Sequence, residues 1–253
     1  MKNGILLWKE IITEPSRGFT QIGKDTKIFL PLLVILALTL VATALLLPIV
    51  RSPEYTKAVI TVQEQTMQEK GSPLSREQAE AMADQLSSDR MKTITTVSTL
   101  VGGLFGYLIM LMVSWLLFKL ILVIFKTPAS MGLLFKVLVY LALFTAVQSI
   151  LKTVVTLSGN WERMLALVQT TDDFKMALQS PISLAALVSY KKVGTTAYFI
   201  IDTLTDIFNY LYYGYLYVAL HRLFGMEKRK ALFAVLVCAV LFIGAGFILT
   251  LLT

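Results

Sequence analysis

Four polar residues with helical spacing lie inside an otherwise apolar block near residue 200. Asp202, Asp206, Asn209 and Tyr213 are separated by four, three and four positions, which places them on one stripe of a helix. Carboxylates inside an apolar segment face a bundle interior or a water-filled cavity, because facing lipid is costly. Such a stripe could carry ions or protons, or line a polar pocket. It could also hold a helix bundle together through hydrogen bonds and one ion pair, and we favour this structural interpretation.

Partners for the two carboxylates are present in another apolar block, at about 133–155. Lys152 is expected near the same end of the bundle as Asp202, and its long side chain can reach that carboxylate. Gln148, one helical turn earlier, offers an amide donor at the depth of Asp206. We therefore predict that these two helices are neighbours, with Lys152 facing Asp202 and Gln148 facing Asp206.

Residues typical of catalytic and metal sites are scarce. The chain has one cysteine, Cys238, and one histidine, His221, which is too few for the usual zinc ligand sets. No Gly-Lys-Ser/Thr sequence indicates a phosphate-binding loop. We predict no catalytic residues, no metal site and no cofactor, and an intramembrane enzyme is the least favoured class of function.

The composition places the polar stripe in a membrane. Of 253 residues, 56% are hydrophobic and 15% are charged, whereas a soluble domain carries roughly 25% charged residues. The apolar residues form blocks long enough to span a bilayer as helices. The predicted fold class is all-α: a polytopic membrane helical bundle over 28–253, in the cell membrane. Its five transmembrane helices are predicted at about 28–50, 100–125, 133–155, 197–220 and 231–252.

The distribution of Lys and Arg predicts the orientation of the bundle. Basic residues outnumber acidic ones in 1–27, in the connection after the second span and in 221–230, but nearly balance them in 51–97 and 152–194. Cytoplasmic segments carry the basic excess. We therefore predict a cytoplasmic N-terminus and an outer C-terminus at Thr253. The net charge of +7 then reflects anionic lipid at the cytoplasmic face, not nucleic acid.

The segment before the first span is predicted to lie along the membrane surface. Ile5, Trp8 and Ile12 recur at helical spacing and suggest a short interfacial helix. Pro15 then restarts the chain, and Phe19 belongs to a second short apolar face. This segment is either an anchor on the membrane or a docking surface for a partner.

The two outer loops are predicted to be helical covers. In 51–97, a turn at Gly71 and a capping box of Ser75 with Gln78 indicate a helical hairpin whose second arm can run into the second span. In 152–194 the pattern is weaker, with apolar residues at helical spacing, a helix cap at Asp172 or Asp173 and a stop at Ser180 and Pro181. The apolar residues of this loop are Trp161, Leu165 and Val168.

Both ends of the chain resemble the bacterial branch of the Yip family, multispan membrane proteins named for binding Ypt/Rab GTPases. At the N-terminal end the similar sequences are Ile-Ile-Thr-Glu-Pro-Ser-Arg-Gly-Phe at 11–19 and Pro-Leu-Leu at 31–33. Near the C-terminal end they are Asp-Ile-Phe at 206–208 and Gly-Met-Glu-Lys-Arg-Lys-Ala at 225–231, where Glu227 takes a position that is usually Ser. The resemblance implies five spans, a cytoplasmic N-terminus and no enzyme activity.

The resemblance also suggests a function through other proteins. It implies a non-enzymatic membrane adaptor that binds other integral membrane proteins, such as an ABC exporter involved in antimicrobial peptide tolerance, and a homo-oligomer is compatible with it. The alternative is a channel or transporter subunit that uses the polar stripe of the fourth span. The candidate partner surface comprises Pro15, Phe19, Lys228, Arg229 and Lys230.

Overall fold

The computed structural model describes residues 4–178 and 181–252, and this part of the chain folds into helices and turns. Thr253, the predicted outer end, and Ser180 of the predicted helix stop lie outside the described residues. The elements are α1 (Gly4–Thr13), α2 (Pro15–Thr20), α3 (Phe29–Leu45), α4 (Leu47–Val50), α5 (Pro53–Glu69), α6 (Arg76–Ser87), α7 (Asp89–Ile124), α8 (Met131–Ser158), α9 (Trp161–Ala166), α10 (Thr171–Ala177), η1 (Leu184–Leu187), α11 (Tyr190–Val193), α12 (Thr195–Thr205), α13 (Ile207–Arg222) and α14 (Lys228–Leu252). The all-α fold class is therefore confirmed.

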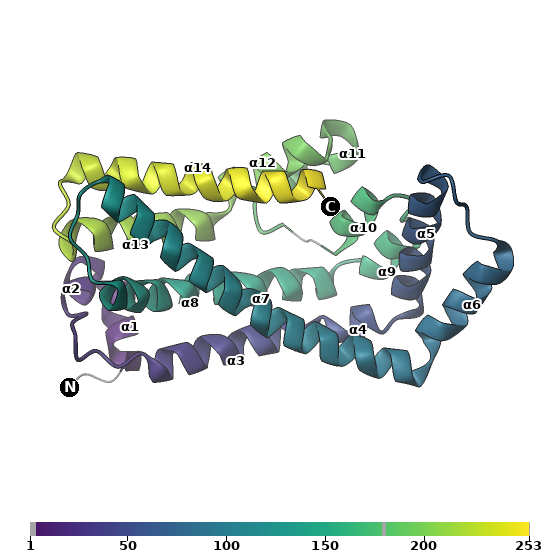
Figure 1. The fold of residues 1–253 in the computed structure, drawn as a ribbon, viewed down its shortest axis with the longest axis horizontal. Helices are drawn as coiled ribbons and strands as arrows, with labels where there is room; N and C mark the ends of the chain where they lie inside the picture. Colours follow the sequence, from purple (N-terminus) through teal and green to yellow (C-terminus); the bar gives the residue numbers. More distant parts are fainter. Residues whose placement is uncertain (1–3, 179–180, 253) are drawn as a thin grey trace.

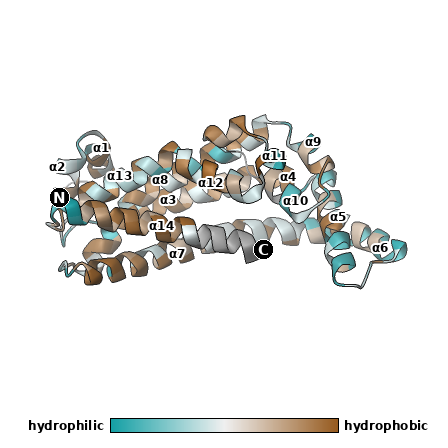
Figure 2. Ribbon diagram, turned by 90° about the horizontal axis from the view of Figure 1, so that it is seen from above, coloured by the Kyte–Doolittle hydropathy of each residue, from teal (hydrophilic) through white to brown (hydrophobic). Residues whose placement is uncertain are grey.

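Within the described residues, three helical segments are long and apolar enough to cross a membrane. They are Phe29–Val50, Asp89–Ile124 and Met131–Ser158, and they correspond to the first three predicted spans. Figure 2 shows apolar residues along these helices and along α14 after its basic first turn, with polar residues at α6 and α10. About 20 helical residues cross the hydrocarbon core of a bilayer. Helix α7 is longer than this, so several of its turns extend beyond the core.

The bundle is elongated, and α8 lies at its centre. In Figure 1, α3, α8, α13 and α14 run along the long axis, and α7 crosses them diagonally. Helices α3, α7 and α13 all pack along α8, and the stretch 137–141 of α8 is buried on every side. A side chain on α8 can therefore meet residues from almost any other long helix, which places Gln148 and Lys152 well for a shared site.

One end of the molecule is a small lobe made by α5, α6, α9 and α10, which we call the distal lobe (Figure 1). The predicted hairpin is present: α5 and α6 pack together, and Ser75 and Gln78 form the predicted capping box. The second arm does not run into the second span, because the extended backbone of Ser88 ends α6 and its hydroxyl caps α7 at Met91. Helix α7 then begins eleven residues before the predicted span, at Asp89.

The distal lobe has its own apolar core. It also has a set of polar contacts centred on Asp173. Asp173, predicted as a helix cap, instead accepts the amides of Gln169 and Thr170, while the hydroxyl of Thr170 accepts the amide of Asp173. Tyr190 donates a hydrogen bond to the same carboxylate, and Lys191 lies 3.4 Å from it. Burial acts to raise the pKa of Asp173, but these hydrogen bonds and the charge of Lys191 outweigh it and hold that pKa below its usual value.

The other end of the molecule carries α1, α2 and the segment 223–230, which covers the turn after α13 and the first residues of α14; we call this end the platform (Figure 1). The predicted apolar face of α1 is divided between two environments, because Ile5 is 49% exposed and Ile12 is 46% exposed whereas Trp8 is buried. Helix α1 instead buries Trp8 together with its neighbours Leu7 and Ile11. Trp8 donates its indole N–H to the carbonyl oxygen of residue 140 in α8 at 3.1 Å. Both faces of α1 are apolar, so this contact with the bundle decides which one is buried.

Candidate functional site

The predicted fourth span is interrupted at its second carboxylate. The single helix over 197–220 is wrong: α12 ends at Thr205, α13 begins at Ile207, and Asp206 between them has an extended backbone. The Asp206 side chain accepts the amide of Phe208 at 2.9 Å and so acts as the N-cap of α13. The polar stripe is therefore not one face of a continuous helix.

Neighbouring side chains satisfy the backbone that this interruption leaves without helical partners. The amide of Asn209 donates to the carbonyl oxygen of Thr203 at 2.9 Å, and the hydroxyl of Tyr210 donates to that of Leu204. Unpaired carbonyls are costly away from water, so this set of contacts stabilises the break as a defined structure.

Asp206 is fully buried, with 0% exposure, and both of its carboxylate oxygens have donors. Gln148 donates its side-chain amide at 2.6 Å, as predicted, and the ammonium of Lys152 lies 3.1 Å away. Both donors come from α8. The prediction that the third and fourth predicted spans are neighbours is confirmed, and Lys152 adds a contact to Asp206 that the sequence analysis did not include.

Asp202 occupies the more accessible side of the same cluster. Lys152 lies 3.3 Å from it, as predicted, and is one third exposed, at 33%. Ser183 donates its hydroxyl to the other carboxylate oxygen at 2.7 Å. Sequence reasoning missed Ser183, because it lies in a loop whose path depends on how η1 packs against α12. We call Lys152, Asp202 and Asp206 the charged triad.

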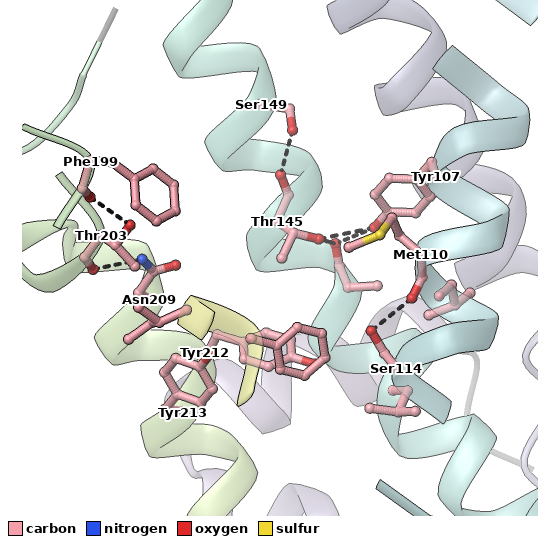
Figure 3. A pocket seen from close by; sticks show the side chains of 15 residues that line it. Tyr107, Met110, Ser114, Thr145, Ser149, Phe199, Thr203, Asn209, Tyr212 and Tyr213 are labelled. Carbon is pink, nitrogen blue, oxygen red and sulfur yellow. Dashed lines mark hydrogen bonds between the residues drawn. The ribbon is translucent and has the colours of Figure 1, made fainter. Parts of the chain in front are cut away.

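Tyr213 lies apart from the charged triad, although the sequence placed it on the same stripe. Its ring packs edge-on against Tyr212, with centroids 5.5 Å apart. Both rings line a cavity of about 400 Å³ between α7, α8, α12, α13 and α14 (Figure 3). Asn209 reaches the same cavity from the helix break.

The site offers polar and charged groups from two neighbouring parts of the bundle. No group of three or more His, Cys, Asp or Glu side chains that could hold a metal ion occurs in the part of the chain that the structure describes. The charged triad combines two carboxylates with one ammonium, which can bind a cation, relay a proton or simply hold α8 to the α12–α13 break. Each carboxylate already has protein donors, and this arrangement supports the structural interpretation of the triad.

Only some residues of the candidate partner surface are exposed. Phe19 is 0% exposed and packs against Tyr215 of α13 with ring centroids 6.4 Å apart, so it is wrong as a surface residue. Pro15 is half-buried at the first position of α2. The exposed members are the three basic residues at the start of α14, which we call the basic triplet: Lys228, Arg229 and Lys230.

Comparison with known proteins agrees with the motifs at both ends of the chain. The family model described as the Yip1 domain matches residues 9–250. No curated protein and no solved structure matches the chain. The family match spans most of the platform, the long apolar helices and the charged triad together. The chain is therefore a multi-pass membrane protein that belongs to the Yip family.

Proposed function

We propose that this protein is a non-enzymatic adaptor of the cell membrane that binds another integral membrane protein through its platform. One observation carries the proposal: the basic triplet is exposed directly after a turn whose Met226 is buried. The hydroxyl of Tyr215 donates to the carbonyl oxygen of Ile12 at 2.8 Å, which ties α13 to the N-terminal segment. Just before the triplet, Met226 is buried, and Gly225 turns the chain with a φ of 68°. A supported, exposed cationic surface suits partner recognition and contact with anionic lipid.

The family suggests which kind of partner this surface would meet. We place the protein in the bacterial branch of the family, as an accessory to a membrane transporter such as an ABC exporter that confers tolerance to antimicrobial peptides. The proposed topology has five spans, with α12 and α13 together forming the fourth and α14 the fifth. The N-terminus and the platform are then cytoplasmic, and the distal lobe is outside.

The topology predicts which engineered cysteines react with a membrane-impermeant thiol reagent. In a chain with Cys238→Ala, Ser72→Cys at the tip of the distal lobe should be labelled in intact cells. Ser16→Cys on α2 should be labelled only after permeabilisation. Both serines are exposed, so accessibility depends on the side of the membrane. Labelling of Ser16→Cys in intact cells, with Ser72→Cys protected, would reverse the proposed orientation.

Charge reversal of the basic triplet should weaken partner binding. Changing Lys228, Arg229 and Lys230 to Glu is expected to reduce the partner recovered after crosslinking by at least about tenfold, because each basic residue contributes roughly 1 kcal/mol near an anionic surface. The matched control reverses three exposed basic residues, two in the distal lobe and one at the start of α7 next to it, and should leave recovery unchanged: Lys57, Lys70 and Arg90. Recovery is measured at equal levels of membrane-inserted protein. An unchanged partner set with the triplet reversed would contradict the proposed surface.

A channel or transporter subunit is the second candidate, and one observation favours it. Interrupted helices with buried polar groups at membrane depth are typical of transporter binding sites, and Asp206 lies at such an interruption. Purified protein in liposomes distinguishes the two functions. A transporter should give ion or proton flux that Asp206→Asn abolishes, whereas the adaptor should give none.

A further inference from the structure

Two cavities meet at the α12–α13 break, and together they have an amphipathic lining. The first measures about 400 Å³ and the second about 420 Å³, sizes that fall within the roughly 300–1,000 Å³ of small-molecule sites. Phe199, Thr203 and Asn209 line both cavities. The wall between them is therefore thin, and one elongated molecule could occupy both.

The second cavity is the polar one. Lys152 and Asp202 are the charged residues that line it, and Asp206 lies directly behind them at 3.1 Å from the Lys152 ammonium. Two carboxylates and one ammonium give this wall a formal net charge of minus one. An uncompensated negative charge is costly at membrane depth, so a ligand group placed here would be favoured if it were cationic.

The first cavity is mainly apolar, with aromatic walls. Its rings come from four different helices: Tyr107, Phe199, Tyr212, Tyr213 and Phe242. The hydroxyl of Tyr107 is already engaged with the carbonyl oxygen of Ala142 at 2.9 Å and with the Thr145 hydroxyl at 3.0 Å. Figure 3 shows Tyr107 and Thr145 on one side of the cavity and Phe199 with Asn209 on the other.

Asn209 links the two cavities chemically. Its amide nitrogen is used in the hydrogen bond to the carbonyl oxygen of Thr203. Its amide oxygen points toward the open space of the first cavity in Figure 3. Asn209 therefore offers an acceptor at the boundary of the two cavities, and the carboxylate of Asp202 lines the second cavity. This arrangement matches a ligand that donates hydrogen bonds at one end and is apolar beyond it.

We propose that the two cavities bind one molecule of an amphiphile with a cationic head group. The ammonium of this ligand lies beside Asp202, and its hydrocarbon chain lies among Tyr107, Tyr212 and Phe242. The chemical class is a long-chain primary amine or a lipid with an ammonium head group. This site goes beyond the adaptor function and does not involve the platform, so either proposal can fail while the other holds.

The test uses full-length protein in lipid nanodiscs and dodecylamine carrying a diazirine near the end of its chain. After irradiation, peptide mapping should place the label on residues of the first cavity, in the segments 107–114 and 209–213. Unlabelled dodecylamine should compete, whereas dodecanol and dodecanoate should not. Equal competition by dodecanol, or a label confined to the exposed residues Leu116 and Leu120 of α7, would overturn the proposal.

Two variants with matched controls sharpen this test. Asp202→Asn should reduce specific labelling by about tenfold, as expected for one charge-assisted contact, and Asp172→Asn in the distal lobe should not. Ser149→Phe, which fills the first cavity, should abolish labelling, while Leu151→Phe on the exposed face of α8 should preserve it. Folding of each variant is checked by its unfolding temperature. Specific labelling that survives Ser149→Phe in folded protein would contradict the assigned site.

Discussion

Replacing Asp206 with leucine is expected to lower the free energy of unfolding by about 2–3 kcal/mol, from a lost N-cap and lost interhelical polar contacts. Leucine cannot accept from the amide of Phe208 or from Gln148, and it leaves the ammonium of Lys152 with Asp202 alone. Asp206→Asn should cost about 1 kcal/mol or less, because asparagine is also a preferred N-cap and keeps an acceptor oxygen. Unfolding of the detergent-purified variants by denaturant gives both values.

The comparison of the two variants decides what Asp206 contributes. Asp172→Leu is the control, since Asp172 is an exposed carboxylate of the distal lobe that accepts an exposed hydrogen bond from Thr195 at 2.9 Å, and its effect should stay within about 0.5 kcal/mol. If Asp206→Asn destabilises as much as Asp206→Leu, the negative charge itself holds the break. If Asp206→Asn is stable but removes a measured flux, the structural interpretation of the triad is wrong.

Replacing Gly18 with alanine should detach α1 from α2 and cost about 2–3 kcal/mol, the upper part of the range for overpacking. A Cβ atom at Gly18 would lie 2.6 Å from the backbone nitrogen and the Cα atom of Ile11. Backbone atoms cannot rotate away as a flexible side chain can, so the two helices must separate. The unfolding temperature should fall, and trypsin should cleave sooner at Lys9 and Arg17 in this variant.

The matched control for Gly18 is another glycine in a helix. A Cβ atom at Gly214 of α13 would meet nothing within 4 Å. Gly214→Ala should therefore be neutral or stabilising by up to about 1 kcal/mol, the usual gain of alanine over glycine in a helix. Equal behaviour of the two variants would mean that the close approach of α1 and α2 does not hold the platform together.

Sequence reasoning found the contacts of the charged triad because few alternatives exist at membrane depth. Asp202 and Asp206 need donors at their own level, and Gln148 and Lys152 repeat the same spacing of four on a neighbouring helix. The long apolar blocks likewise fixed where α3, α7 and α8 lie, since only helices satisfy the backbone in lipid. These predictions depend on local composition and on depth.

The features that sequence reasoning missed depend on tertiary packing. The α12–α13 break lies within a long apolar block. Its signal in the sequence was Asp206, because Asp is a preferred N-cap residue. Asn209 and Tyr210 follow it and donate hydrogen bonds to the carbonyl oxygens that the break frees. The buried face of α1 could not be chosen from two apolar faces without knowing that Trp8 meets α8. Phe19 was predicted as a surface residue because its contact with Tyr215 of α13 likewise depends on tertiary packing.

The platform and the triad lie in different parts of the fold, which separates the two candidate functions physically. The basic triplet forms the start of α14, at the end of the molecule that carries α1 and α2, whereas the triad lies where α8 meets the break. An adaptor should therefore tolerate Asp206→Asn while it loses its partner on reversal of the triplet. A transporter subunit should show the opposite pattern.

Site-specific photocrosslinking in native membranes tests the adaptor function most directly. A photoreactive amino acid replaces Arg229 in the platform, or Lys70 in the distal lobe as the control, and captured proteins are identified by mass spectrometry. The adaptor account predicts that position 229 captures the same integral membrane protein in independent preparations and that position 70 does not. Capture of lipid alone at position 229, or of an identical set of proteins from both positions, would contradict it.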